Sequence, residues 1–289
     1  MDYFFHIIVL ILVYTVLSSS LDLIVGHAGQ VSIAHASYFG IGAYTSALLT
    51  VNAGLPFSIG VISSGLLSAV VGVGVGIPSL RTRGDIFAIV TFAFQVLTYQ
   101  LLNNLTALTG GPLGVSGIPA PQIFGVELVT PGSYVALYGA LLVPLFGLLA
   151  MLKKSQFGRE LHAIRGDDVW ATSIGIDAVR LTVAAMGIGA FSAGIGGALM
   201  AHYISFVAPQ SYTVMESVFI LTMVVVGGAG SVWGAVVGSA LLIVLPEALR
   251  LISIPYEIAG HIRQVLYGLM LVGFVAWRPR GLMGRYGFD

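Results

Sequence analysis

Few side chains of this chain are equipped for chemistry, and the largest group of charged ones gathers in one stretch. Lys and Arg number 12, Asp and Glu another 12, and nine of these 24 fall within residues 153–180. The sequence has no GxxxxGK(S/T) phosphate loop, no HExxH zinc helix and no GxGxxG motif. The six histidines are scattered; His27 and His35, eight residues apart, are more typical of packed polar residues than of metal ligands. We therefore expect no catalysis and no bound cofactor or metal in this chain.

The stretch at residues 153–180 is polar within an otherwise apolar chain, and charged side chains are expensive in hydrocarbon. We therefore expect it to face water. Phe157, Leu161, Ile164 and Val169 are spaced to lie roughly along one side of a helix, which predicts a short amphipathic helix. We interpret the stretch as a segment that takes force from a soluble partner and passes it to a membrane domain.

Composition places the rest of the chain in a membrane. Hydrophobic residues make up 57% and charged residues 8%, with a mean hydropathy of +0.98, whereas about a quarter of the residues of a soluble domain are charged. Long uncharged runs, rather than alternating short segments, exclude a β-barrel. The 38 glycines suit close helix packing, the absence of cysteine excludes disulfides, and no basic face for nucleic acid is present. The sequence predicts an all-α, polytopic transmembrane helical bundle that forms one domain, 1–289.

The apolar runs give the number of membrane spans, since a spanning helix needs about 20 apolar residues. A polar segment at residues 26–37 precedes an apolar run at 38–52. Residues 217–246 carry no charge and are interrupted at 227–231, which favours two short spans meeting at a glycine turn over one broken helix. We expect about nine spans, give or take one. The other runs are residues 3–21, 57–80, 86–108, 133–152, 181–202 and 258–277.

The basic residues predict the orientation. Ten of the 12 Lys and Arg lie in three clusters: Arg81 with Arg83, the five within 153–180, and Arg278, Arg280 and Arg285. Nine spans place all three clusters on one side, which the positive-inside rule makes cytoplasmic. The N-terminus is then outside, the C-terminus is cytoplasmic, and residues 109–132 form an irregular periplasmic loop.

Glycines at four-residue spacing are candidates for helix packing. Such spacing fits static close packing better than a sliding contact. The two sets are Gly72 with Gly76, and Gly230, Gly234 and Gly238, each expected on one face of a helix.

Polar residues near the apolar runs have two interpretations each. The segment at residues 26–37 either lines a pathway or forms a cytoplasmic turn. Gln95 sits within the run 86–108 and is expected to bond a neighbouring helix rather than to line a route. Glu216 and Glu247 are interpreted as marking the ends of spans.

Several motifs, in order along most of the chain, give the sequence its resemblance to a known family. It resembles the permease subunits of branched-chain amino-acid ABC importers, of the M type rather than the H type. Asp22 stands where the family usually has an amide and His27 where it often has an aromatic residue. The matching stretches are GHAGQVSIAHASYFGIGAY from Gly26, LRTRGDIFAIVT from Leu80, LTGGPLGVSGIP from Leu108, residues 157–176, VGGAGS from Val226, and residues 267–282.

The resemblance implies a type II-like importer permease in the bacterial inner membrane. Its partners would be two ABC ATPase subunits that hold ATP and Mg, a homologous H-type permease, a periplasmic amino-acid-binding protein and the lipid bilayer. Within residues 157–175, a coupling helix would place Arg159 and Arg165 against acidic groups of an ATPase while apolar residues fill its groove. The residues expected to couple are Phe157, Gly158, Arg159, Leu161, Ile164 and Arg165, and those expected to line the pathway are Gln30, His35 and Tyr38.

Two other functions remain open at this point. The same family includes importers of urea and short amides. A secondary transporter would need no ATPase and would more often carry a carboxylate paired with a cation inside the membrane, and the sequence gives no sign of such a pair. A membrane-embedded enzyme is disfavoured, because no nucleophile–base or metal cluster is recognisable.

Overall fold

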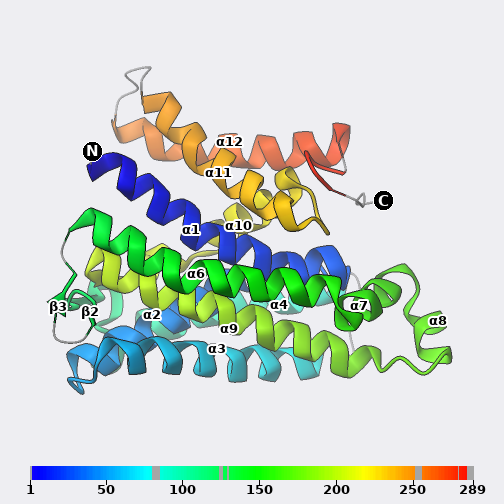
Figure 1. The fold of residues 1–289 in the computed structure, drawn as a ribbon, viewed down its shortest axis with the longest axis horizontal. Helices are drawn as coiled ribbons and strands as arrows, with labels where there is room; N and C mark the ends of the chain where they lie inside the picture. The colour runs from blue at the N-terminus through cyan, green and yellow to red at the C-terminus, as the bar shows by residue number, and fades with distance from the viewer. Residues whose placement is uncertain are drawn as a thin grey trace.

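A computed structural model describes residues 2–79, 85–123, 126–128, 130–250, 256–278 and 280–284. Long helices run side by side along one direction and define two ends of a bundle (Figure 1). We call them the α7 end, where α7 and α8 protrude, and the strand end, where β2 and β3 lie. The N-terminus lies toward the strand end and the C-terminus toward the α7 end. Leu80, Arg81, Arg83 and Arg285, which enter the expectations above, lie outside the described residues.

The expected apolar runs correspond to helices. Among the described residues, five stretches are long and apolar enough to cross a bilayer, and three shorter apolar helices accompany them. The run at 217–246 is two helices joined at a glycine turn, as favoured above. The total of about nine spans stays a prediction. The helices are α1 (Asp2–Asp22), α3 (Phe57–Ser79), α4 (Asp85–Asn104), α6 (Pro131–Lys154), α9 (Ala178–Ile204), α10 (Val214–Gly227), α11 (Val232–Arg250) and α12 (Tyr256–Trp277).

Two helices begin in the middle of the bundle instead of at an end. Helix α2 (His35–Val51) follows a π-helical turn, η1 (Leu23–His27), and an irregular segment, residues 28–34. Helix α10 follows β4 (Phe206–Val207) and a 3-10 turn, η3 (Pro209–Tyr212). The backbone N–H of Ser37 bonds Gln95, the eleventh of the 20 residues of α4, so both helices start about halfway along α4.

Glycines allow α2, α3 and α9 to pack closely. A Cβ on Gly42 of α2 would overlap the backbone of Gly194 on α9, and one on Gly72 of α3 would lie 2.5 Å from the Cβ of Ala190. A Cβ on Gly76 would lie 3.3 Å from the sulfur of Met186 on α9, closer than most side-chain contacts. Small residues at these helix contacts thus bring the backbones together; that the contacts of Gly72 and Gly76 are static stays a prediction.

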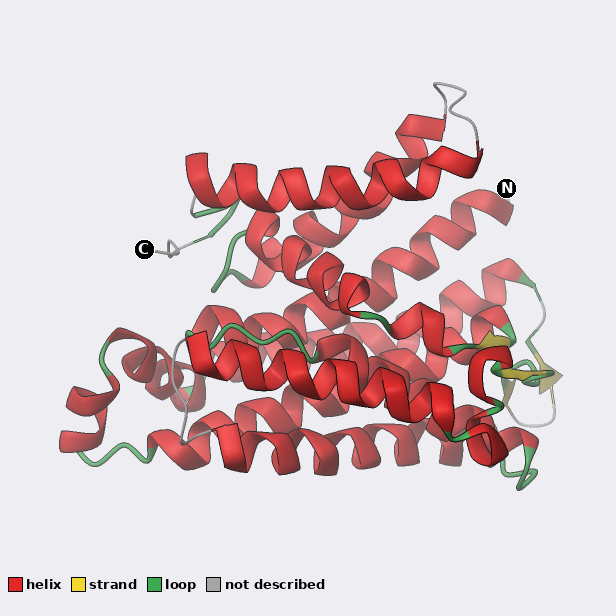
Figure 2. Cartoon of the chain, turned by 180° about the vertical axis from the view of Figure 1, so that it is seen from behind, coloured by secondary structure: helices red, strands yellow, loops and turns green. Residues whose placement is uncertain are grey.

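Short strands join the loops at the strand end. The segment between α4 and α6 holds α5 (Thr106–Thr109), η2 (Gly111–Leu113), β1 (Val115–Ser116), β2 (Gln122–Ile123) and β3 (Val126–Glu127). Strand β1 pairs antiparallel with β4, with Val115 opposite Val207, and β2 pairs with β3. The first pairing ties this loop to the chain that leads into α10 (Figure 2).

Candidate functional site

The charged segment that follows α6 forms two helices rather than one. Helix α7 (Gln156–Gly166) ends where Asp167 caps α8 (Asp168–Ser173) by accepting a hydrogen bond from the backbone N–H of Trp170 at 2.9 Å. Val169, expected on the same side as Leu161, is 69% exposed on α8. The break at Asp167 therefore rotates the second half of the segment away from the first.

The apolar face of α7 packs on its own chain. Leu161 is 0% and Ile164 6% exposed, in a cluster with Leu23, Ala28 and other buried residues, and Phe157 packs at its edge. This corrects the expectation that these side chains fill a groove of a partner: they fix α7 to the bundle. An amphipathic pattern predicts an apolar contact but does not say which chain supplies it.

The corner between α6 and α7 is tight. The backbone N–H and the hydroxyl of Ser155 both donate to the carbonyl of Leu152, at 3.2 and 2.7 Å. A Cβ on Gly158 would overlap the carbonyl oxygen of Lys153, so only glycine fits there. The guanidinium of Arg159 donates to the carbonyl of Lys154 at 3.1 Å, while its side chain is exposed. Helix α7 is thus held to the end of α6 without a flexible hinge.

Arg165 contacts its own chain at the other end of α7. Its guanidinium donates to the carbonyl of Gly26 in η1. Its stem lies against Gly29, where φ is +70° and an added Cβ would lie 2.6 Å from the Cγ of Arg165. The expected pairing of Arg165 with an acidic group of a partner is therefore corrected: the side chain holds the segment that leads into α2.

A buried ion pair lies beside this corner. The Lys153 ammonium is 2.9 Å from Asp22 Oδ2 and donates to the hydroxyl of Ser19 at 2.9 Å. Asp22 Oδ1 accepts the backbone N–H of Gly230 at 2.7 Å. The side chains of Lys153 and Asp22 are 1% and 2% exposed. We call Ser19, Asp22, Lys153 and Gly230 the Asp22 cluster; it joins α1, α6 and the turn between α10 and α11.

This ion pair corrects the expectation that no carboxylate pairs with a cation inside the chain. Asp22 and Lys153 are separated by 131 residues, so no sequence spacing indicates their contact. His27 lies nearby, with Nδ1 3.7 Å from Asp22 Oδ2 and 3.3 Å from the carbonyl oxygen of the same residue. The argument against secondary transport, that no such ion pair is indicated by the sequence, therefore does not hold.

The glycines near the α10–α11 turn divide into two kinds. Gly230 lies in the turn with φ +76° and not on a face of α11, which corrects its expected grouping with the other two. Gly234 and Gly238 do lie on α11, and an added Cβ on either would meet the backbone of α10. The chain after α12 returns to this place: the N–H groups of Leu282 and Met283 bond the last carbonyls of α10, each at 2.9 Å.

A second polar cluster joins the starts of α2 and α10. Gln95 is 0% exposed. Its Oε1 accepts hydrogen bonds from the backbone N–H and hydroxyl of Ser37, both at 2.8 Å, and from the hydroxyl of Ser217 at 3.1 Å; its Nε2 donates to the carbonyl of Tyr212 at 2.8 Å. We call Ser37, Gln95, Tyr212 and Ser217 the mid-bundle node. Gln95 thus bonds neighbouring elements, as expected.

The three residues expected in a pathway lie inside this chain. His35 and Tyr38 are both 0% exposed, and Gln30 is half-buried. His35 Nε2 hydrogen-bonds the hydroxyl of Ser20 at 2.8 Å, whereas its Nδ1, the Tyr38 hydroxyl and Gln30 Oε1 have no hydrogen-bond partner among the described residues. Their role in a pathway stays a prediction. Residues 26–37 are mostly buried and lead toward the middle of the bundle rather than forming a surface turn, although Gly29 is exposed.

Glu216 does not mark the end of a span. It lies in the first turn of α10, half-buried, and accepts a hydrogen bond from the hydroxyl of Tyr14 at 2.5 Å. Tyr14 is in the second half of α1, and α10 starts beside the mid-bundle node, so this carboxylate lies within the bundle. Glu247 lies in α11, and its side chain is not among those that the structure describes.

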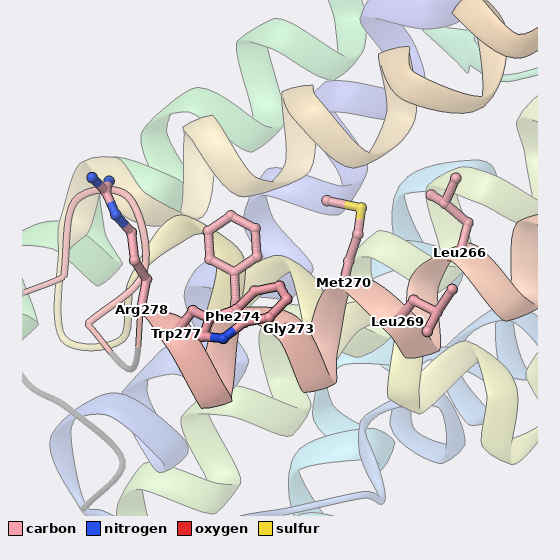
Figure 3. A pocket seen from close by; sticks show the side chains of 7 residues that line it. All are labelled: Leu266, Leu269, Met270, Gly273, Phe274, Trp277 and Arg278. Atoms are coloured by element: carbon pink, nitrogen blue, oxygen red, sulfur yellow. The ribbon is translucent and has the colours of Figure 1, made fainter.

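Two hollows lie away from these clusters. One, of about 380 Å³, is an apolar groove along α12, where Leu266, Met270 and Phe274 stand on one side and Arg278 lies at the C-terminal end (Figure 3). The other, of about 500 Å³, lies at the strand end between Thr50, Phe57, Gln122 and His202. Among the described residues, no group of three or more His, Asp or Glu is arranged to hold a metal ion.

Comparison with known proteins decides the family. A family model described as the permease component of the branched-chain amino acid transport system matches residues 3–275. The chain belongs to this permease family. The permease is 34% identical to LivM of Salmonella typhimurium, a high-affinity branched-chain amino acid transport system permease protein, over 94% of this chain and 68% of LivM. LivM of Escherichia coli K12 is also 34% identical, over 95% and 68%. Both are M-type members, as the resemblance indicated.

A more distant relative also matches over most of its length. LivH of Salmonella typhimurium is 22% identical over 94% of the permease and 91% of LivH. No solved structure matches the permease. Its relatives are transport subunits rather than enzymes, and its apolar helices and family indicate a protein of the inner membrane.

Proposed function

We propose that this permease is the membrane subunit of an ABC importer that moves branched-chain or related hydrophobic amino acids into the cytoplasm. Two partner ATPases would bind ATP and Mg, an H-type permease would complete the pathway, and a periplasmic protein would deliver the amino acid. The observation that carries the proposal is α7: a polar, partly exposed helix fixed at both ends to one end of a membrane bundle. The names of the LivM relatives support the substrate class.

The surface offered to an ATPase is the end of α6 and the outer side of α7 and α8. Lys154 and Arg159 are exposed there, together with Val169 and Trp170, which are 69% and 58% exposed and follow Asp167 and Asp168. The basic side chains suit an acidic rim of a groove, and the apolar ones suit its floor. ATP would change the conformation of the permease only by favouring one state of this contact, because a ligand shifts an equilibrium by its differential affinity.

The proposed orientation places the α7 end in the cytoplasm and the N-terminus outside. Exposed Arg278 and Arg280 follow α12 at the C-terminal end, on the same side as α7 (Figure 1). Clustered basic residues on one side favour the cytoplasm. The strand end, with the hollow near His202, would then face the binding protein.

Two experiments test this proposal. Purification of the tagged permease in mild detergent from its native membrane should recover ATP-binding subunits and a second permease. Reconstituted with them, it should take up leucine in an ATP-dependent manner that urea and acetamide do not inhibit. Inhibition by urea or acetamide would instead assign the importer to the short-amide class.

Secondary transport is the second candidate, because the chain holds the buried Asp22–Lys153 pair and the half-buried carboxylate of Glu216. A permease that repeatedly purifies alone, while another importer from the same membrane stays assembled, would favour it. Uptake driven by a proton gradient without ATP would establish it.

A substitution on the exposed side of α7 tests the coupling role. Arg159→Glu should leave membrane insertion intact but reduce uptake at least tenfold at an unchanged or higher rate of ATP hydrolysis, because it places a carboxylate against the expected acidic rim. Arg180→Glu is the matched control, since Arg180 is also exposed at this end and pairs with its neighbour Asp177 at 2.9 Å. Normal uptake by the Arg159 variant would contradict the assignment of α7.

A further inference from the structure

We propose that the buried Asp22–Lys153 ion pair is a positioning element that transmits movement of α7 to α1 and to the α10–α11 turn, beside a second connection that runs through Arg165 to the start of α2. The inference rests on the proposed function, because α7 has a movement to transmit only when it docks on an ATPase. It assigns a role to Asp22 and Lys153. Both lie outside the exposed coupling surface, and their positions in the sequence do not indicate that they meet.

The first step is the rigid connection of α7 to Lys153. Ser155 bonds Leu152 twice, Arg159 bonds Lys154, and Gly158 lies directly on the carbonyl of Lys153. A displacement of α7 therefore displaces Lys153 with it, because the corner has no residue free to absorb a change of backbone angle.

The second step is from Lys153 to two other elements. Its ammonium binds Ser19 and Asp22 on α1, and Asp22 in turn holds the backbone of Gly230 in the α10–α11 turn. One carboxylate oxygen of Asp22 therefore binds α6 and the other binds this turn. Lys153 and Asp22 are 1% and 2% exposed, so water does not readily replace either charged group, and α1, α6 and the turn are expected to move as one unit or to separate at a large cost.

The third step leads from the other end of α7 to the middle of the bundle. Arg165 holds Gly26 near the end of η1 and packs on Gly29, two residues after η1, so α7 contacts the chain where it leaves η1. Residues 28–34 then extend to α2, where the N–H groups of Ala36 and Ser37 bond Ser217 and Gln95 of the mid-bundle node. A continuous set of contacts therefore joins α7 to the two helices that begin inside the bundle.

An ion pair suits this task better than an apolar contact. Replacing a buried pair with well-packed apolar residues is often neutral or stabilising, so stability alone does not require it. A charge-assisted hydrogen bond fixes distance and direction between its partners. The pair is therefore expected to matter more for the transfer of movement than for folding, and these two roles are separable by experiment.

The variants are made in the assembled importer. Asp22→Asn and Lys153→Met each leave one buried charge unpaired; Asp22→Asn combined with Lys153→Met leaves none. Lys153→Arg keeps the cation. The matched control is Thr15→Val combined with Ser239→Ala, which removes a buried hydrogen bond of 2.7 Å between α1 and α11 away from α7. In proteoliposomes, leucine uptake and ATP hydrolysis are measured together, and the melting temperature of each complex is measured in detergent.

We expect both single variants to lower the amount of leucine taken up per ATP at least tenfold. The double neutral variant should melt near the wild type yet keep the lowered ratio, whereas Lys153→Arg and the Thr15/Ser239 control should keep the wild-type ratio. A wild-type ratio in the double neutral variant, an equal loss in the control, or a double variant that fails to assemble would each overturn the inference. Failure of the proposed function is seen separately, as a wild-type permease that does not assemble with ATPases or take up leucine with ATP.

Discussion

Gln95→Leu tests the mid-bundle node most directly, because one buried side chain serves four hydrogen bonds there. The substitution keeps roughly the same volume and removes every polar atom. It removes the acceptor of the hydroxyls of Ser37 and Ser217 and the donor to the carbonyl of Tyr212. The two hydroxyls can rotate toward carbonyls of their own helices. The backbone N–H of Ser37 keeps its second acceptor, the carbonyl of Ala34 at 3.0 Å. The carbonyl of Tyr212 is left without its partner.

The size of the effect follows from the carbonyl of Tyr212. A buried polar group without a partner costs about 1–3 kcal/mol, so Gln95→Leu should destabilise the permease by roughly 1–3 kcal/mol. For chains of a few hundred residues, 1 kcal/mol changes the melting temperature by about 2–4 °C, which gives a decrease of roughly 2–12 °C. Because the node holds the starts of α2 and α10 together, uptake should fall with it.

The assay is thermal unfolding in mild detergent, followed by size-exclusion chromatography of the remaining folded fraction. Gln100→Leu is the matched control: it makes the same change on the same helix at an exposed side chain, and it should be neutral or slightly stabilising. A melting temperature of Gln95→Leu within about 2 °C of the wild type, or no lower than that of Gln100→Leu, would refute the role of the node.

Two further predictions concern packing and pH. Gly42→Ala should destabilise the permease by about 1–3 kcal/mol, because its methyl group would overlap the backbone of Gly194; Gly74→Ala, where nothing lies within 4 Å, should have no such effect on the melting temperature. Burial, and then the charge of Arg165, lower the pKa of His162 in α7 from its ordinary value. When α7 is packed on the bundle, His162 therefore binds a proton less readily than when α7 is detached. The packing of α7 is fully favoured above a pH of about 6.5 and weakens below it. Hydrogen exchange of α7 should rise between pH 7.5 and 5.5, after correction for the intrinsic rate, and His162→Gln should reduce that rise; an identical rise in both would contradict it.

The long helices were predictable because each depends on a local property of the sequence. An apolar run of about 20 residues has few alternatives to a spanning helix, and the runs at 57–80 and 133–152 correspond closely to α3 and α6. The glycine turn at 227–231 was predictable for the same reason, since glycines of positive φ, Gly228 and Gly230, separate α10 from α11.

The clusters were not predictable because their members are far apart along the chain. Asp22 and Lys153 meet only after α1 and α6 pack, and Gln95 meets Ser217 across 122 residues. The apolar side of α7 was visible as a pattern, but hydrophobic spacing is the same whether the neighbour is the same chain or another. Glu216 was misplaced because a charge next to an apolar run usually marks its end, whereas α10 begins two residues earlier, inside the bundle.

The two helices that begin in the middle bear on how the permease is made. Helix α2 has 17 residues and α10 has 14, or about 26 and 21 Å at 1.5 Å per residue, against about 30 Å of hydrocarbon. Neither spans a bilayer alone, and the backbone before each needs partners that lipid does not supply. The backbone N–H of Ser37 can bond Gln95 only after 58 more residues are synthesised, and that of Ala36 can bond Ser217 only after 181. Helix α2 therefore enters the membrane during translation before the hydrogen bonds at its start are complete. They are completed only when α10 has followed it into the membrane.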